Sequence, residues 1–277
     1  MSTSSQMAAR RGPRTAVVTG ATAGIGRAIA IALGELGWRV AIGARREERL
    51  ADAVKRVEAA GGKALGHPLD VTEPASVEAF FAEVERRWGC ADVLVNNAGA
   101  ARPGRLDRLS YADIRAAIET SLVGALFATR RAVEALRARG LPGDLVFISS
   151  RSAAESWAHH LPYGASKAGV ESAARTLRLE LEGTGIRVAL IRVGDTLGTE
   201  FSASWTPADF AENLAVWQRL ALLRHAGLMQ PEDVARAVVL AVTTRPGVQL
   251  ELIGVDAQAP SAAPGGDPAA GGQGAAP

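Results

Sequence analysis

Short aliphatic segments alternate along this chain with longer segments of helical spacing, and this alternation limits the fold more than any other feature. Such an order predicts units of strand, helix and strand, whose strands lie parallel in one sheet with helices on both faces. The aliphatic segments are apolar throughout rather than at every second residue, which is typical of strands buried on both faces. We therefore predict an α/β fold with a doubly wound parallel sheet of about seven strands. The predicted strands span residues 15–19, 39–43, 64–69, 93–96, 144–149, 187–193 and 248–253.

A single large domain accounts for most of the chain. With 277 residues, of which 48% are hydrophobic, the chain can bury a substantial core within one domain. We place this domain at residues 14–256. Segments 1–13 and 257–277 lack the apolar side chains that would offset the entropy of ordering, so we predict two disordered tails.

The helix predicted after the third strand illustrates the helix signals. Thr72 is expected as its N-cap, and Pro74 fits its first turn. Five residues at helical spacing are expected in the core rather than at a cofactor: Val77, Phe80, Phe81, Val84 and Trp88.

Composition excludes several classes of function. The formal net charge is +2 and the basic residues are dispersed, apart from a loose group at Arg10, Arg11 and Arg14, so no nucleic-acid partner is expected. No apolar run approaches the roughly 20 residues of a membrane span, and the start lacks a signal-peptide stretch. The single cysteine, Cys90, cannot form an intramolecular disulfide, and no metal site is predicted. We expect a cytoplasmic protein without a membrane partner.

A glycine turn follows the first predicted strand and leads into a helical segment at residues 27–36. Glycines let backbone N–H groups approach a pyrophosphate, and a helix N-terminus adds partial positive charge. A strand, such a turn and a helix in this order indicate the start of a dinucleotide-binding Rossmann fold, although a tight structural turn is the alternative. The predicted cofactor-binding residues here are Gly20, Thr22, Ala23, Gly24, Ile25 and Gly26.

The end of the second predicted strand carries Arg45 and Arg46. An NAD site would be expected to have an acidic residue here for the ribose hydroxyls, and Ala44 cannot serve. A guanidinium suits a 2′-phosphate, so Arg45, with Arg46 as a helper, favours NADP(H). Two solvated arginines at the start of a helix are the alternative.

Three further motifs complete a pattern that can be named. Tyr163 and Lys167 are four residues apart at the start of a predicted helix, so both point from one face toward the same pocket. Ser150 lies 13 residues before Tyr163, and the fourth predicted strand ends in Asn96-Asn97-Ala98-Gly99. Together with the glycine turn, these motifs resemble the short-chain dehydrogenase/reductase family over about residues 15–256.

The resemblance implies roles for the catalytic residues. Reduction of a carbonyl needs a hydride for carbon and a proton for oxygen, and a phenol with a pKa near 10 is a poor acid-base group at neutral pH. Tyr163 is expected to handle the proton, with the charge of Lys167 lowering its pKa. Ser150 is expected to hydrogen-bond the substrate oxygen, whereas Ser149 is expected to turn away.

The resemblance also implies cofactor contacts outside the glycine turn. Asp70 is expected at the adenine amino group, although it could equally cap a helix, and Val71 follows it. Small residues after the fourth strand allow close approach, and a threonine after the sixth strand is expected at the carboxamide, with Thr196 favoured over Thr199. The implied contacts are Asp70, Val71, Asn97, Ala98, Gly99, Tyr163, Lys167, Gly194 and Thr196.

Two positions depart from the family pattern. Ser121 stands where the family usually has an asparagine that holds a water of the proton relay, so it either supports catalysis or only packs in a helix. Val193 stands where a proline commonly precedes the glycine that here is Gly194.

The resemblance places a substrate lid at about residues 196–228. Its aromatic residues Trp205, Phe210 and Trp217 would suit a hydrophobic substrate, although packing explains them nearly as well. His159 and His160 precede Tyr163 on a loop that lines the pocket in this family, and at least one of them is expected at the surface.

We therefore predict an NADP(H)-dependent oxidoreductase that transfers a hydride between the nicotinamide and a carbonyl or secondary alcohol. Reduction of an imine or enone is an alternative on the same scaffold. An alternative from a different functional class is a sensor or scaffold protein that binds NADP(H) and has only weak catalytic activity. A homodimer or homotetramer follows from the resemblance, through helices that contain residues 116–138 and 163–182 and through small residues at the second: Ala165, Ala168, Ala173 and Ala174.

Overall fold

A computed structural model describes residues 13–199 and 205–260 of the chain. Within these residues, seven strands form one sheet in the order β3-β2-β1-β4-β5-β6-β7, and every neighbouring pair is parallel. This confirms the predicted doubly wound sheet. The strands are β1 (Thr15–Thr19), β2 (Arg39–Ala44), β3 (Lys63–Pro68), β4 (Val93–Asn96), β5 (Gly143–Ser150), β6 (Ile186–Val193) and β7 (Leu252–Val255).

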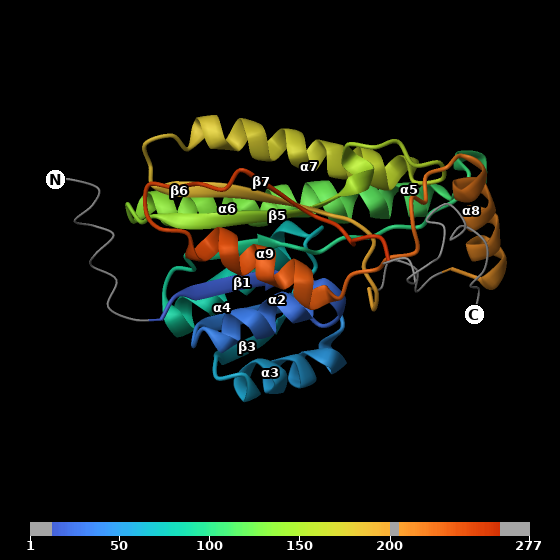
Figure 1. The fold of residues 1–277 in the computed structure, drawn as a ribbon. Helices are drawn as coiled ribbons and strands as arrows, with labels where there is room; N and C mark the ends of the chain where they lie inside the picture. Colours follow the sequence, from blue (N-terminus) through green and yellow to red (C-terminus); the bar gives the residue numbers. More distant parts are fainter. Residues whose placement is uncertain (1–12, 200–204, 261–277) are drawn as a thin grey trace.

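Helices cover both faces of the sheet (Figure 1). Residues of α2, α3 and α9 share one buried apolar cluster with the sheet, and residues of α4, α6 and α7 share a second cluster on the opposite face. The helices are α2 (Gly24–Glu35), α3 (Leu50–Ala59), α4 (Pro74–Trp88), α5 (Tyr111–Ile118), α6 (Gly124–Ala138), α7 (Leu161–Glu180), α8 (Pro207–Arg219) and α9 (Pro231–Thr243), with a π-helical turn η3 (Glu119–Val123) and short 3-10 helices that include η4 (Arg151–Ala153).

Two predicted boundaries are wrong. β7 begins at Leu252 rather than at residue 248, because the side-chain oxygen of Gln249 and not its backbone takes the N–H of Val188. Thr72 is not the N-cap of α4, since its hydroxyl and its N–H both donate to Asp70 Oδ1 and Glu73 holds the N-cap position. The predicted core stripe of α4 is confirmed, with four of its members buried and Trp88 half-buried.

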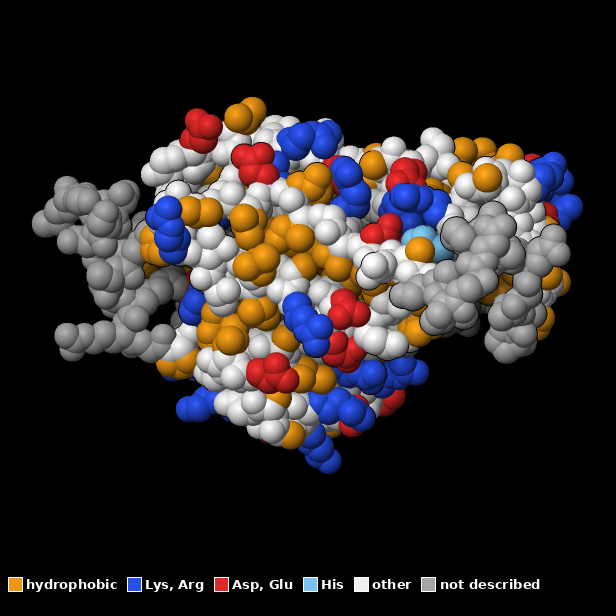
Figure 2. Space-filling view, viewed as in Figure 1, with side chains coloured by type: hydrophobic (Ala, Val, Ile, Leu, Met, Phe, Trp, Pro, Cys, Tyr) orange, Lys and Arg blue, Asp and Glu red, His pale blue; other side chains and the backbone are white. Residues whose placement is uncertain are grey.

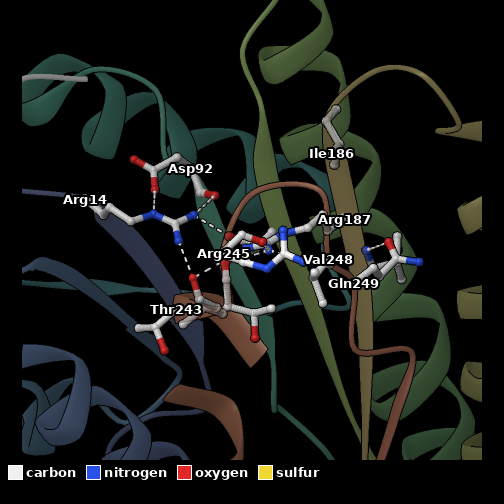
Figure 3. Close-up of polar contacts among 12 residues, drawn as sticks. Arg14, Asp92, Ile186, Arg187, Thr243, Arg245, Val248 and Gln249 are labelled. Atoms are coloured by element: carbon white, nitrogen blue, oxygen red, sulfur yellow. Dashed lines mark hydrogen bonds and ion pairs between the residues drawn. The ribbon is translucent and has the colours of Figure 1, made fainter. Parts of the chain in front are cut away.

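A partly buried ionic network lies at the amino ends of the central strands. Asp144, at the start of β5, accepts hydrogen bonds from Arg187 Nε at 2.6 Å and from Arg14 Nη2 at 2.5 Å. Arg14 also binds Asp92, and Figure 3 shows this pair beside the chain that follows α9. The two guanidiniums bind backbone carbonyls at the end of α9 and beyond, namely those of Val242, Thr244 and Val248. The network thus ties four strands and a helix end together at the edge opposite their carboxyl ends.

The surface in Figure 2 carries apolar side chains over the region of α9 and β7. Exposed hydrophobic residues on these elements include Leu240 and Leu252. None of the helices in the described ranges is both long and apolar enough for a membrane span. The two predicted tails lie largely outside the described residues.

Candidate functional site

The glycine turn links β1 to α2 at the carboxyl edge of the sheet. Gly20 and Gly24 have φ angles of 66° and 51°, a region that disfavours residues with a Cβ. A Cβ on Gly26 would lie 2.3 Å from Asn97 Nδ2, whose amide donates to Thr19 O at 2.9 Å. The N-cap of α2, Ala23, has no side-chain cap, so the first N–H groups of the helix have no acceptor from that side chain. Such a cradle fits an anionic diphosphate.

The residues after β4 are tied to β1. Thr19 Oγ1 accepts hydrogen bonds from the N–H groups of Asn97 and Ala98, at 3.1 and 3.0 Å. Asn96 turns to the other side and donates to Thr129 Oγ1 at 2.8 Å. The segment from Asn97 to Gly99 is therefore held directly beside the glycine turn.

The two arginines after β2 lie next to the same turn. Arg45 is exposed, and Arg46 Nη2 is 3.5 Å from Thr22 Oγ1. This pair gives the turn a cationic edge that fits a further phosphate. Asp70 Oδ1 accepts hydrogen bonds from Thr72 in the turn before α4. Val71 is buried and packs against Gly124.

Ser150, Tyr163 and Lys167 meet where β5 ends and α7 begins. Burial raises the pKa of Tyr163, and a hydrogen bond with the Ser150 side chain opposes that rise. Lys167 Nζ lies 5.7 Å from the centroid of the Tyr163 ring and donates to Ile148 O at 2.8 Å. Burial lowers the pKa of Lys167 to about 8. The Tyr163 phenol and the Lys167 ammonium group thus lie close together at this end of the sheet.

The electrostatics of this pair differ from the expectation that Lys167 lowers the pKa of Tyr163. Burial has the larger effect on Tyr163, because a phenolate loses its hydration inside the protein. The same desolvation acts on the ammonium, which becomes easier to deprotonate.

Ser121 lies in the π-helical turn η3 and is buried. Its Oγ accepts from Ala100 N at 3.2 Å, so the hydroxyl fixes the segment that follows β4. A Cβ built on Gly99 would lie 3.4 Å from Ser121 Oγ and 3.7 Å from Lys167 Nζ. Gly99 therefore separates Ser121 from Lys167, and both border the same small space.

The segment after β6 approaches the glycine turn. Thr196 Oγ1 donates to Gly194 O at 3.1 Å, and Thr199 lies close to Gly24 of the glycine turn. Residues 200–204 of the lid lie outside the described residues, whereas α8 closes one end of the molecule (Figure 1).

An aromatic group lies between the lid and Tyr163. The His160 ring is stacked on Trp157 and packs edge-on against both Trp217 and Tyr163. Burial lowers the pKa of His160 to about 4, so its ring is neutral at pH 7. His159 is half-buried, with Nδ1 2.7 Å from Asn213 Oδ1, so of the two histidines it is the one that reaches the surface.

Comparison with known proteins agrees with this geometry. The family model for short chain dehydrogenases matches residues 14–209 of this chain. A 3beta-hydroxysteroid dehydrogenase 1 from Eggerthella lenta is 36% identical over 81% of this chain and 84% of its own length. The chain belongs to the short-chain dehydrogenase family.

Solved structures of such dehydrogenases share the fold. A variant of actinorhodin polyketide ketoreductase with NADPH has a TM-score of 0.78 and 32% identity, covering 88% of this chain and 96% of that one. The closed form of a serine dehydrogenase complexed with NADP+ has a TM-score of 0.76 and 31% identity, covering 87% of this chain and 94% of that one. The chain is thus an oxidoreductase of this family.

In this short-chain dehydrogenase, α7, the helix that carries Tyr163, is held by a group of polar residues that we did not predict from the sequence. Glu171, one turn beyond Lys167, is buried and accepts from Ser149 Oγ at 2.9 Å. Arg192 of β6 binds the same carboxylate through Nε and Nη2, at 2.9 and 2.6 Å. Ser149 therefore turns away from the site, as predicted, and joins β5 to α7. An acidic residue in the middle of a predicted core helix is the signal that could have pointed to it.

A second unpredicted group contains Arg151, which directly follows Ser150. It is buried and paired with Asp195 and Asp256. Across the described part of the chain, no cluster of three or more histidine, cysteine or acidic side chains could hold a metal ion.

Proposed function

We propose that this protein is an NADP(H)-dependent oxidoreductase that interconverts a carbonyl and a secondary alcohol, with Tyr163 as the acid-base group. The observation that carries the proposal is the hydrogen-bonded pair of Ser150 and Tyr163 beside Lys167, at the sheet edge that also carries the glycine turn. The relatives that contain NADPH or NADP+ support the choice of cofactor.

The cofactor would be held at both of its ends by residues of this chain. Backbone N–H groups of the glycine turn would bind the diphosphate, and Arg45 with Arg46 would bind the 2′-phosphate. Gly194 and Thr196 would face the nicotinamide, and Lys167 would face its ribose. Bound NADPH would supply the hydride.

The proton of the reaction would come from Tyr163. Ser150 would orient the substrate oxygen, and Tyr163 would donate its proton to that oxygen as the C–O bond becomes single. The ammonium of Lys167 would favour the phenolate that remains, because it places positive charge close to the phenol. Ser121 would assist only through the position of Ala100, to which its hydroxyl is bonded.

The substrate we propose is hydrophobic. Trp157, His160 and Trp217 present apolar or neutral rings beside Tyr163. The hydroxysteroid named in one relative and the polyketide named in another have large apolar frames that such a wall would accept. These three rings carry no charge at pH 7, so they offer no cation to a carboxylate. They therefore favour an uncharged ketone over one that bears a carboxylate.

The proposal is tested by mixing purified protein with NADPH and a panel of ketones, quinones and imines, and following the loss of NADPH absorbance. We expect oxidation of NADPH with at least one hydrophobic ketone. Binding of NADPH without turnover on any member of the panel would contradict the proposal and favour a sensor.

The matched variant in that assay is Arg45→Asp, with Arg49→Asp as its control on η1 (Glu47–Arg49). Loss of a charged hydrogen bond to the 2′-phosphate should raise the KM for NADPH about 10-fold to 100-fold and leave the KM for NADH nearly unchanged. An unaltered preference for NADPH in Arg45→Asp would refute the assigned phosphate contact.

Reduction should slow as pH rises through about 8, where Lys167 loses its proton because burial lowers its pKa to about 8. Below that pH the ammonium supports proton release from Tyr163, and above it the neutral amine does not. In Lys167→Arg the charge persists, so the decline should move to higher pH even if the overall rate falls. A pH profile of kcat/KM for both proteins measures this, and the same decline near pH 8 in both would exclude Lys167 as its source.

The predicted assembly of two or four copies stays a prediction, and the structure narrows the residues that could form it. Ala165 and Ala168 of α7 are exposed and could pack against a second copy. Ala174 is wrong as an interface residue, because it is fully buried in the core between α7 and the sheet.

A further inference from the structure

Arg151 joins the ends of three neighbouring strands. It follows Ser150 of β5 directly, and its guanidinium is buried. Nη2 donates to Asp195 in the segment after β6, and Nη1 donates to Asp256, the first residue after β7, both at 2.9 Å. A single side chain therefore fixes the carboxyl ends of β5, β6 and β7 relative to one another.

The two carboxylates hold the segment that begins at Gly194. A Cβ on Gly194 would lie only 2.0 Å from Asp256 Oδ1, and Gly194 N donates to Val255 O at 2.9 Å. Asp195 O accepts from Met229 N at 2.9 Å. A proline at position 193 would restrict the backbone through its ring, and Val193 does not. Ion pairs and hydrogen bonds restrain this segment instead.

The opposite side of Arg151 supports the aromatic wall. Its guanidinium lies 4.8 Å from the centroid of the Trp157 ring, a cation–π distance. Trp157 is stacked on His160, which in turn packs edge-on against Tyr163. Arg151 thus contacts, through two partners, both the segment with Thr196 and the wall beside Tyr163.

We propose that Arg151 is a positioning residue that holds the nicotinamide side of the site, through Asp195 and Asp256, in the geometry needed for hydride transfer. This inference rests on the proposed function. Both Nη groups of Arg151 are already paired with carboxylates, so Arg151 would act on the site through these partners. Its loss would let residues 194–199 adopt other conformations. The apparent affinity for the cofactor would then fall in proportion to the fraction of molecules that remain in the binding-competent conformation.

The experiment compares Arg151→Met with Arg131→Met. Arg131 of α6 is a close match, because it is similarly buried, pairs with the carboxylates of Glu78 and Glu85, and lies over the ring of Phe81, yet it is on a helix face away from the site. Both variants lose one charged, ion-paired arginine. Differences between them therefore report the position of Arg151 and not the loss of an ion pair.

Two ligands separate the halves of the cofactor site. NADPH fluorescence titration measures binding to both halves, and displacement by adenosine 2′,5′-bisphosphate measures the adenosine half alone. We expect Arg151→Met to weaken NADPH binding about fivefold to tenfold, with less than about a twofold change for the bisphosphate. Its kcat should fall about tenfold, since small errors of position are costly in the transition state. Arg131→Met should change none of these values.

Other outcomes are equally informative. Failure of the unaltered protein to bind NADPH would overturn the proposed function and this inference with it. Unchanged NADPH binding and kcat in Arg151→Met, or equal weakening of both ligands, would overturn the inference alone. If Arg151→Met does not fold, Asp195→Asn decides, because Asp195 is half exposed and the buried Arg151 keeps Asp256 as a partner. That variant should show a smaller loss for NADPH only, and no loss would overturn the proposal.

Discussion

Tyr163→Phe should lower kcat/KM for ketone reduction by about 100-fold to 10,000-fold, the range that a positioned acid-base group contributes. The substitution removes only the hydroxyl, so the hydrogen bond with Ser150 is lost while the packing of the ring against His160 stays. NADPH should still bind with nearly unchanged affinity. Steady-state rates and fluorescence titration measure the two quantities separately.

The chain offers a matched control for this substitution. Tyr111 is the other of its two tyrosines and is largely exposed at the start of α5. Tyr111→Phe should leave kcat/KM unchanged. Activity like that of the unaltered protein in Tyr163→Phe would exclude Tyr163 as the proton donor.

Asp144→Ala should lower the free energy of unfolding by about 3 kcal/mol, the lower end of the cost of leaving a buried charge without its partner, because Arg14 and Arg187 are only partly buried. The Asp144 carboxylate is buried, and each of its oxygens binds a different arginine. Among the described carboxylates, Asp144 is the one that pairs with Arg187. Urea unfolding followed by far-UV circular dichroism measures the change.

The control for this change is Asp52→Ala. Asp52 pairs with Arg56 on the surface of α3, where both side chains are about half exposed. Loss of this pair should leave the free energy of unfolding nearly unchanged, because water screens and solvates both exposed charges. An equally small cost for Asp144→Ala would show that the network at the amino edge contributes little to stability.

The fold was predictable because its signals are local. Each strand is a short apolar run, and the glycine turn is a strained backbone path that only small residues allow. The boundaries were less predictable. Thr72 has the residue type of an N-cap, yet Asp70 two residues earlier takes both of its donors.

The candidate site was predictable for the same reason, but its electrostatics were not. Tyr163 and Lys167 share a helix face because they are four residues apart, whatever surrounds them. Their pKa values depend on how deeply that face is buried, which no spacing reveals. We expected Lys167 to lower the pKa of Tyr163, whereas burial raises it.

By itself, the sequence determined the strand order along the chain, the glycine turn, and the identity of the residues from Ser150 to Lys167 that are proposed to act. Only the tertiary structure decided which charges support them. Arg151 meets partners 44 and 105 residues away, and Glu171 meets Ser149 22 residues earlier. Local patterns extend over one element, whereas these contacts depend on how β5, β6, β7 and α7 pack together. The Tyr163 and Lys167 pair is therefore a property of the sequence, and the frame that holds it in place is a property of the fold.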